Sequence, residues 1–429
     1  MMLHSFPQFH RVFFQRLLWI SSVFVVLWCD IHQSRGGDLF ETLRERMVRD
    51  DIAGGGIQDL RVIESMRVTL RHEFMPIAQR DLAYFDMGVP IGEAQTISGA
   101  FVVAYMTEKL ETKPTDTVLE IGTGSGYQAA VLSPLVKTVY SIEINKVLGR
   151  RAKLALDKLG YRNVITTIGD GFQGWKEHAP FDKIIVTCSP ENVPTPLVAQ
   201  LAEGGRMIIP VGERYDQTLL LLVKRNGTLV EESLCPSLFV PMTGAAEDGR
   251  RVLPDGNKPA LHNGSFENRL KDLDIPESWY YGRQITLHRS PDGNTFLQLT
   301  NEQPSRPSQV FQGFSINGRV VDRLTIRVSL RGEEILGGPY PDQIPGICVQ
   351  FFDEKRSRTS RDRIGPWKGS FDWKEVQGSI SVPLWANEAI LQIGLLGATG
   401  RLDVDDISIE GRKKTLTSAM KEVEIQPEK

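Results

Sequence analysis

Residues 118–132, VLEIGTGSGYQAAVL, decide the fold of this 429-residue chain. They begin with a short apolar run of the kind that a buried parallel strand shows. Gly122, Gly124 and Gly126 follow at every second position, and glycine lets a backbone turn tightly and approach a ligand closely. Residues 128–132 then favour a helix. The stretch therefore predicts a glycine loop between the carboxyl end of a strand and the N-terminus of a helix.

The spacing of these glycines indicates which ligand the loop suits. The dinucleotide-binding fingerprint is G-x-G-x-x-G, whereas this loop reads G-x-G-x-G and follows an acid, Glu120. Such a loop fits a pyrophosphate poorly and resembles the S-adenosyl-L-methionine loop of methyltransferases. A glycine run by itself is equally consistent with an ordinary tight turn, so the strands that follow decide more.

Two further acids stand where a nucleoside would meet them. The segment TVYSIEI (138–144) predicts a second strand with Glu143 near its carboxyl end, where an acid usually accepts both ribose hydroxyls. The other interpretation of Glu143 is a surface acid at a strand end. The segment NVITTIGDG (163–171) predicts a third strand that ends in Asp170-Gly171, where an acid can accept from the adenine amino group.

The alternation of strands and helices predicts the fold. Two more strands are expected at 181–187 and 204–212, and helical stretches such as 147–160 separate the strands. This order is typical of a parallel sheet with helices on both faces. The segment 218–234 then predicts an antiparallel hairpin with Asn226-Gly227 in its turn. We therefore expect an α/β, Rossmann-like class I methyltransferase fold, in which an antiparallel hairpin closes a parallel sheet.

From about residue 39 to 250 the chain resembles the protein-L-isoaspartate O-methyltransferases. The resemblance rests on long segments, among them 56–76, 89–110, 118–132, 169–175, 180–187, 204–212 and 238–243. The most specific is Gln95-Thr96-Ile97-Ser98, before the first strand, because ordinary methyltransferases lack it. The resemblance implies S-adenosyl-L-methionine-dependent methylation of the α-carboxylate of L-isoaspartyl residues in damaged proteins or peptides, which initiates repair to L-aspartyl.

The same resemblance implies a role for individual residues. It implies cofactor contacts from Gln95, Thr96, Ile97, Glu120, Gly122, Gly124, Gly126, Glu143, Asp170, Gly171 and Thr243, and substrate contacts from Ser98 and the backbone of Val240. A carboxylate is ionised at neutral pH and needs no general base, so we expect catalysis by alignment and partial desolvation.

Ser98 matches the family's catalytic serine, whose hydroxyl can donate to the substrate carboxylate. It lies in no G-x-S-x-G elbow, which disfavours a Ser-His-Asp mechanism. The alternative role of Ser98 is to cap the helix that GAFVVAYM (99–106) predicts. The chain departs from the family at Ala94, where Gly is frequent, at Leu238, where Arg is frequent, and at TCSP (187–190). Leu238 weakens the expectation of cationic help in holding the substrate carboxylate.

The first residues bear on location. Arg11 and Arg16 precede an apolar run over 17–29, which is typical of a secretory signal and short for a membrane span. Three interpretations remain open for 1–36: a cleaved signal, a retained membrane anchor, or a start codon placed too early. The first two predict an exported or periplasmic protein, and the third a cytoplasmic one. Membrane contact is expected only through this segment, if it is uncleaved.

Composition excludes some classes of function. The formal net charge is −3, so no general attraction to nucleic acid is expected. The four cysteines are scattered without a C-x-x-C pair, so no zinc site is indicated.

After Arg250 the pattern changes to short alternating strands. We expect a linker at 251–262, an all-β jelly-roll sandwich at 263–411 and a charged tail at 412–429. The segments 263–267 and 400–410 resemble the ends of carbohydrate-binding modules, which implies a carbohydrate ligand and a structural calcium. Six aromatic residues could form a sugar-stacking platform or instead pack in the core: Trp279, Tyr280, Tyr281, Trp367, Trp373 and Trp385. Glu267 with Asp405 or Asp406 would suit calcium, or are solvated acids.

Two classes of function follow. The first is an exported isoaspartyl methyltransferase that carries an accessory sandwich. The second is an exported polysaccharide- or protein-binding protein with an inactive methyltransferase-like domain. Methylation of a small carboxylic acid is disfavoured by the segment 95–98.

Overall fold

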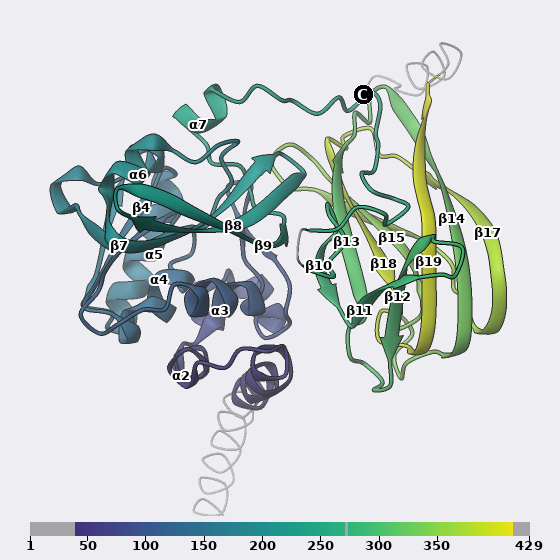
Figure 1. Cartoon of the computed structure of the whole chain (residues 1–429), viewed down its shortest axis with the longest axis horizontal. Helices are drawn as coiled ribbons and strands as arrows, with labels where there is room; N and C mark the ends of the chain where they lie inside the picture. Colours follow the sequence, from purple (N-terminus) through teal and green to yellow (C-terminus); the bar gives the residue numbers. More distant parts are fainter. Residues whose placement is uncertain (1–38, 271–272, 415–429) are drawn as a thin grey trace, which may run out of the picture.

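The computed structural model describes residues 39–270 and 273–414, and Figure 1 shows them as two parts side by side. The expected signal or anchor segment, 1–36, lies outside the described residues, as does the tail beyond 414. Within the described ranges, no helix combines the length and the apolar character needed to cross a membrane.

A seven-stranded sheet forms the centre of the N-terminal part, with the order β5-β4-β3-β6-β7-β8-β9. The first five strands in this order pair in parallel, and β7, β8 and β9 pair antiparallel. The expected parallel sheet closed by a hairpin is therefore confirmed. The strands are β3 (Thr117–Ile121), β4 (Thr138–Glu143), β5 (Val164–Ile168), β6 (Phe181–Val186), β7 (Leu201–Glu213), β8 (Asp216–Arg225) and β9 (Thr228–Ser237).

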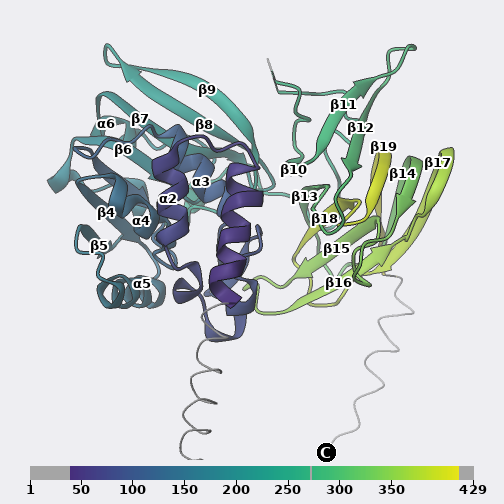
Figure 2. The same cartoon turned by 90° about the horizontal axis from the view of Figure 1, so that it is seen from below.

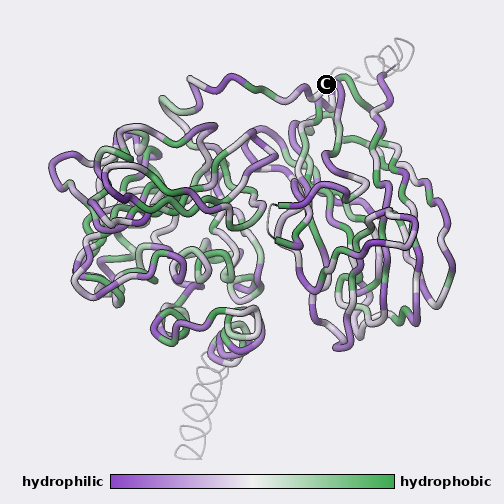
Figure 3. Tube along the Cα trace, viewed as in Figure 1, coloured by the Kyte–Doolittle hydropathy of each residue, from purple (hydrophilic) through white to green (hydrophobic). Residues whose placement is uncertain are grey.

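Alternate residues of the central strands face opposite sides of this sheet. Ile185 and Ile208 belong to one core, which also contains residues of α2 to α5. Ile184 and Met207 belong to a second core, which α6 covers. Figure 3 shows the middle of the sheet as a largely hydrophobic trace. The helices are α2 (Leu60–Val68), α3 (Ala100–Lys109), α4 (Tyr127–Leu132), α5 (Lys146–Leu159), α6 (Thr195–Gln200) and α7 (Ala245–Asp248).

A small hairpin precedes α3 and carries the segment 95–98. It consists of β1 (Val89–Gly92) and β2 (Gln95–Ile97), which pair with each other and with no strand of the large sheet. This part of the chain also contains short π and 3₁₀ helices: η1 (Met47–Ala53), η2 (Arg71–Phe74), η3 (Ile77–Leu82), η4 (Ser133–Leu135), η5 (Gly171–Gln173) and η6 (Lys176–His178).

The C-terminal part is a sandwich of two antiparallel sheets, which Figure 2 shows facing each other. Their orders are β10-β13-β18-β15-β16 and β11-β12-β19-β14-β17, and one apolar core lies between them. An all-β sandwich is confirmed, whereas its jelly-roll connectivity stays a prediction. The strands are β10 (Tyr280–Arg283), β11 (Ile285–Arg289), β12 (Thr295–Asn301), β13 (Gln309–Ser315), β14 (Val321–Leu336), β15 (Gly346–Phe352), β16 (Thr359–Ile364), β17 (Gly369–Ser381), β18 (Glu388–Gly394) and β19 (Thr399–Lys413).

The two parts meet along the antiparallel hairpin that closes the large sheet. Residues 251–262, the predicted linker, contain no helix or strand. β10 of the sandwich lies against β9 of the large sheet.

Candidate active site

A cavity of about 370 Å³ opens at the carboxyl ends of β3, β4 and β6, within the usual range of ligand pockets of roughly 300–1,000 Å³. The glycine loop forms its floor. Gly122 and Gly124 line it with φ angles of 94° and 55°, which glycine adopts without steric cost. A Cβ at Gly122 would lie 2.6 Å from Oγ1 of Thr187, so the loop also has no room for a side chain there. Gly126 packs instead against Leu156 of α5.

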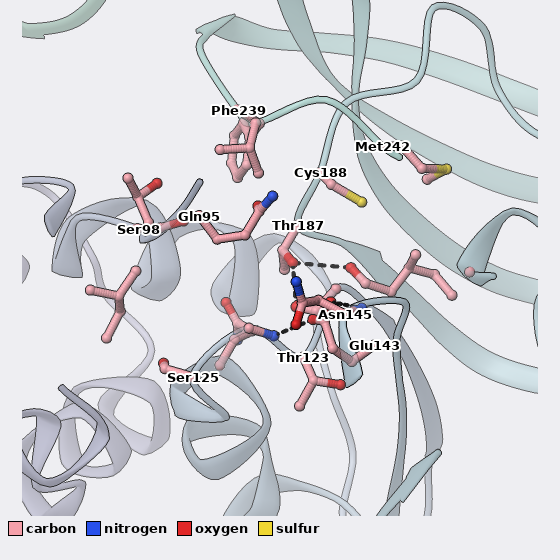
Figure 4. Close-up of a pocket in the computed structure, with 18 of the residues that line it drawn as sticks. Gln95, Ser98, Thr123, Ser125, Glu143, Asn145, Thr187, Cys188, Phe239 and Met242 are labelled. Carbon is pink, nitrogen blue, oxygen red and sulfur yellow. Dashed lines mark hydrogen bonds between the residues drawn. The ribbon is translucent and has the colours of Figure 1, made fainter. Parts of the chain in front are cut away.

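Glu143 holds this loop to the end of β4. Its Oε2 accepts a hydrogen bond from the backbone N–H of Gly124 at 2.7 Å, and its Oε1 accepts one from the N–H of Asn145 at 2.9 Å. The residue is buried and lines the cavity. Each carboxylate oxygen accepts more than one hydrogen bond, so capacity remains for two ribose hydroxyls. Figure 4 shows Glu143 beside Asn145, whose side chain caps α5.

Glu120 lies behind the loop and does not line the cavity. Its side chain is fully buried and accepts a hydrogen bond from the Ser141 hydroxyl, which is also 2.6 Å from Oγ1 of Thr123 in the loop. Burial raises the pKa of Glu120 to about 8, so the carboxyl is mostly neutral at pH 7. Glu120 therefore supports the glycine loop through its hydrogen bond with Ser141, which in turn contacts Thr123. A direct contact between Glu120 and the cofactor stays a prediction.

Gly171 and Thr243, two of the expected cofactor contacts, both line the cavity. The Asp170 carboxylate lies just outside the lining. It accepts from the N–H groups of Phe172 at 2.9 Å and Ala245 at 3.0 Å. Asp170 therefore ties the turn after β5 to the segment that follows Thr243.

The segment 95–98 lies across the cavity from Glu143 in Figure 4, with Phe239 above it. All four of its residues, Gln95, Thr96, Ile97 and Ser98, line the cavity. The interpretation of Ser98 as a helix cap is wrong, because α3 has Gly99 at its N-cap and no side-chain cap. The N–H of Phe101 instead donates to Asp86 at 2.9 Å. Among the described residues the Ser98 hydroxyl has no hydrogen-bond partner, so it is available to a ligand.

The opposite wall is the segment 239–243. Val240 lines the cavity, and its carbonyl oxygen accepts from the N–H of Ser189 at 2.8 Å, which leaves one lone pair free. Leu238 does not line the cavity. Sequence reasoning missed the lining residues Asn145, Thr187, Cys188, Phe239 and Met242. Asn145 and Thr187 could have been found, because they follow the ends of parallel strands next to the glycine loop.

Cys188 lines the cavity and belongs to the segment 187–190, one of the departures from the family pattern. Burial raises the pKa of its thiol well above the usual range, so the thiol is neutral at physiological pH. Cys188 therefore lines the cavity as a neutral thiol.

The acids expected to bind calcium are held by protein donors. Glu267 accepts from the N–H and hydroxyl of Thr295 at 2.8 and 2.9 Å, and Asp405 accepts from Asn294 at 2.7 Å. Asp406 lies beside Asp405 in a groove of the sandwich. In the part of the chain that the structure describes, no cluster of three or more His, Cys, Asp or Glu residues could hold a metal.

The α/β part of the chain is similar to known proteins. The family model for protein-L-isoaspartate(D-aspartate) O-methyltransferase matches residues 42–247. Protein-L-isoaspartate O-methyltransferase 1 of Cupriavidus necator is 45% identical over 236 residues, which are 52% of this chain and 90% of the relative. The protein-L-isoaspartate O-methyltransferase of Gloeobacter violaceus is 48% identical over 198 residues, 46% of this chain and 97% of the relative.

Solved structures are similar over the same part. A protein-L-isoaspartate O-methyltransferase aligns with a TM-score of 0.44 and 27% identity, over 51% of this chain and 74% of the other. A protein from Plasmodium falciparum, solved with S-adenosyl-L-homocysteine, aligns with a TM-score of 0.41 and 26% identity, over 47% of this chain and 97% of the other.

Proposed function

Because the chain belongs to the protein-L-isoaspartate O-methyltransferase family, we propose that its α/β part methylates the α-carboxylate of L-isoaspartyl residues with S-adenosyl-L-methionine. The methyl ester then cyclises to a succinimide with loss of methanol, and hydrolysis of the succinimide can yield a normal L-aspartyl residue. One observation carries this proposal. A single cavity brings the family-specific segment 95–98 to face the glycine loop and the buried Glu143 carboxylate.

The residues fit this cofactor. Gly122 and Gly124 line the cavity without side chains, and Glu143 has acceptor capacity for a vicinal diol. S-adenosyl-L-methionine supplies an activated methyl group when bound. The chain orients the nucleoside with Glu143 and the acceptor with Ser98. Ile97, Met106 and Phe239 line the space between with apolar groups, which exclude water and favour partial desolvation of the carboxylate.

The test of the proposed function is substrate choice. The full chain should transfer methyl groups from S-adenosyl-L-methionine to a synthetic peptide that contains L-isoaspartate, and not to its L-aspartate twin. The isomers differ in the position of the α-carboxylate along the backbone, and alignment with the methyl donor depends on that position. Incorporation of labelled methyl groups measures both rates. Equal rates on the two peptides would contradict the repair assignment. Absence of cofactor binding in calorimetry would favour the inactive binding protein instead.

Export is a proposal that rests only on the sequence of residues 1–36. Calcium binding by Glu267 and Asp405 or Asp406 likewise stays a prediction.

A second candidate function concerns the sandwich. Of the two interpretations of the six aromatic residues, packing inside the protein fits four: Trp279, Tyr280 and Trp367 are buried, and Trp385 packs against the core. Trp373 differs, because 39% of its surface is exposed and it lines a groove of about 750 Å³.

The groove offers mixed chemistry suited to a carbohydrate. The Arg331 guanidinium lies 5.1 Å from the Trp373 ring centroid and 5.4 Å from that of Phe296. Asp292, Asn294 and Glu375 add polar groups to the lining. An aromatic face packs on the C–H face of a sugar, and nearby polar groups can bond its hydroxyls. We therefore also propose that this groove binds carbohydrate.

Trp373→Ala should weaken retention on a polysaccharide that the full chain binds by about tenfold, the scale of losing one aromatic contact. Affinity electrophoresis against a panel of neutral and acidic polysaccharides measures the retention. Tyr340→Ala is the matched control, because Tyr340 is 62% exposed and lies outside the groove. Lack of retention on every polysaccharide, or an equal loss in both variants, would contradict this second proposal.

A further inference from the structure

Strand β10 of the sandwich reaches the two segments that form the substrate side of the cavity. The Tyr281 hydroxyl donates to the carbonyl oxygen of Leu238 at 2.6 Å. Two residues further on, the Arg283 guanidinium pairs with the Asp86 carboxylate and lies 4.2 Å from the Phe101 ring centroid. Each of these contacts joins the sandwich to the α/β part.

The Arg283 contact acts on the start of α3, directly after Ser98. One oxygen of Asp86 accepts from the N–H of Phe101 at 2.9 Å, and the other accepts from Arg283. A Cβ at Gly99 would lie 2.9 Å from the first of these oxygens, so Asp86 is packed against the backbone that carries Ser98. Arg283 thus holds the Asp86 carboxylate, and Asp86 in turn holds the backbone turn that follows Ser98.

Removal of Arg283 would also leave the carboxylates of Asp51 and Asp86 near each other without this positive charge. Burial and the nearby Asp86 charge raise the pKa of Asp51 to about 6, whereas Arg283 acts to lower it. Without the guanidinium, Asp86 would lose its counter-charge in a partly buried setting, and its hold on Phe101 would weaken.

The Tyr281 contact acts on the opposite wall. Leu238 immediately precedes Phe239 and Val240, which line the cavity. Its carbonyl accepts from Tyr281, and its Cδ2 would lie 3.5 Å from a Cβ at Gly313 in β13. Leu238, at the position where related enzymes often have Arg, therefore contacts the sandwich. Gln217 holds the next residue, Phe239, from within the α/β part through two hydrogen bonds, of 2.7 and 3.1 Å.

We propose that β10 of the sandwich is a positioning element for methyl transfer, in which Arg283 orients the Ser98 turn and Tyr281 orients the Leu238–Val240 segment. This inference rests on the proposed methyltransferase function. It assigns the sandwich a role in the reaction itself. The cofactor side is unaffected, because Glu143 and the glycine loop are held by contacts within the α/β part.

The test compares full-length variants with the wild type. Arg283→Met removes the charge and keeps the length of the side chain, and Tyr281→Phe removes only the hydroxyl. Both should lower kcat/KM for the L-isoaspartyl peptide, by about tenfold for Arg283→Met, because loosened segments misplace the acceptor. The affinity for S-adenosyl-L-methionine should stay within about twofold, and Arg283→Lys should recover part of the loss.

Tyr215→Phe is the matched control. The Tyr215 hydroxyl also bridges the two parts, to Glu388 at 3.2 Å, without bonding the start of α3 or the Leu238 backbone. Its kcat/KM should equal that of the wild type. An equal loss in the control, or a parallel loss of cofactor affinity, would reduce the role of β10 to general stability and overturn the inference.

A second readout does not depend on turnover. Hydrogen exchange should accelerate over residues 98–101 in Arg283→Met and over 238–240 in Tyr281→Phe, with the remainder of the molecule unchanged. Unchanged exchange and unchanged kinetics in both variants would overturn the inference while leaving the proposed function intact. An inactive wild type that binds the cofactor would overturn the proposed function instead.

Discussion

Glu143→Ala is expected to weaken binding of S-adenosyl-L-methionine by about 1.5–3 kcal/mol, or about 10- to 150-fold. Two losses combine in this variant. The ribose loses a charged acceptor, and the N–H groups of Gly124 and Asn145 lose the carboxylate that aligns the glycine loop. Isothermal titration with the cofactor measures the change.

Glu120→Gln is the matched control for that experiment. Glu120 is the neighbouring buried acid, but it does not line the cavity, and its carboxyl is mostly neutral at pH 7 because its pKa is raised to about 8. Because Glu120 supports the loop only through Ser141, its replacement should leave cofactor affinity within about threefold, the effect of about 0.6 kcal/mol. A larger loss would support the direct contact between Glu120 and the cofactor that the sequence predicts.

A cofactor analogue separates the two losses in Glu143→Ala. S-adenosyl-L-homocysteine without its ribose hydroxyls should bind the wild type more weakly than the parent compound, and the difference should vanish in Glu143→Ala. A difference of the same size in both proteins would show that the ribose is held elsewhere.

The α/β part could be predicted from sequence because its signals are local. Buried parallel strands are continuous apolar runs, and the three glycines mark the turn between β3 and α4. Asn226 and Gly227 both have positive φ in the turn between β8 and β9, as an Asn-Gly hairpin requires.

The position of Glu120 behind the loop could have been predicted only from strand register. Glu120 of β3 pairs with Ser141 of β4, and neighbouring strands place such residues on the same face of the sheet. Ser141 and Glu143 are two residues apart on β4 and share that face. Glu143 is the last residue of its strand and lines the cavity, whereas Glu120 lies one residue before the end of β3 and is bonded to Ser141.

The sandwich was harder to read because its contacts are long-range. The edge strand β16 has the sequence TSRDRI and carries no apolar alternation, so no pattern marks it. Trp279 and Tyr280 are adjacent and both buried, which alternation alone does not predict. Trp279 belongs to the core between the two sheets. Tyr280 has its hydroxyl near Gly313, where Tyr215 and Leu238 of the α/β part also lie.

The contact between Leu238 and the sandwich illustrates the same limit. In the sequence, Leu238 is only a departure from a family pattern in which Arg is frequent, and nothing indicates which residues Leu238 contacts. Its partner Tyr281 lies more than forty residues further along the chain, across the predicted linker. Only the folded arrangement relates the departure to the presence of a second domain.

Ser98→Ala is expected to lower turnover on the L-isoaspartyl peptide by about 10- to 100-fold while leaving cofactor affinity and thermal stability unchanged. The hydroxyl lines the cavity, and α3 takes its N-cap from Gly99 and a bond to its first turn from Asp86. Loss of one positioning hydrogen bond in a desolvated site costs about 1–3 kcal/mol, which transition-state arithmetic converts to that range of rates. Kinetics, calorimetry and thermal melts on one preparation provide the three measurements.

A genuine cap gives the contrasting control. Asp59 is the N-cap of α2, and its side chain accepts from the N–H of Arg61. Asp59→Ala should lower the free energy of unfolding by about 1 kcal/mol and leave turnover per folded molecule unchanged. If Ser98→Ala behaves in the same way, melting at a lower temperature but turning over at the wild-type rate per folded molecule, Ser98 has no part in catalysis. If its melting temperature is unchanged and its rate falls, the hydroxyl acts on the substrate and not on the helix.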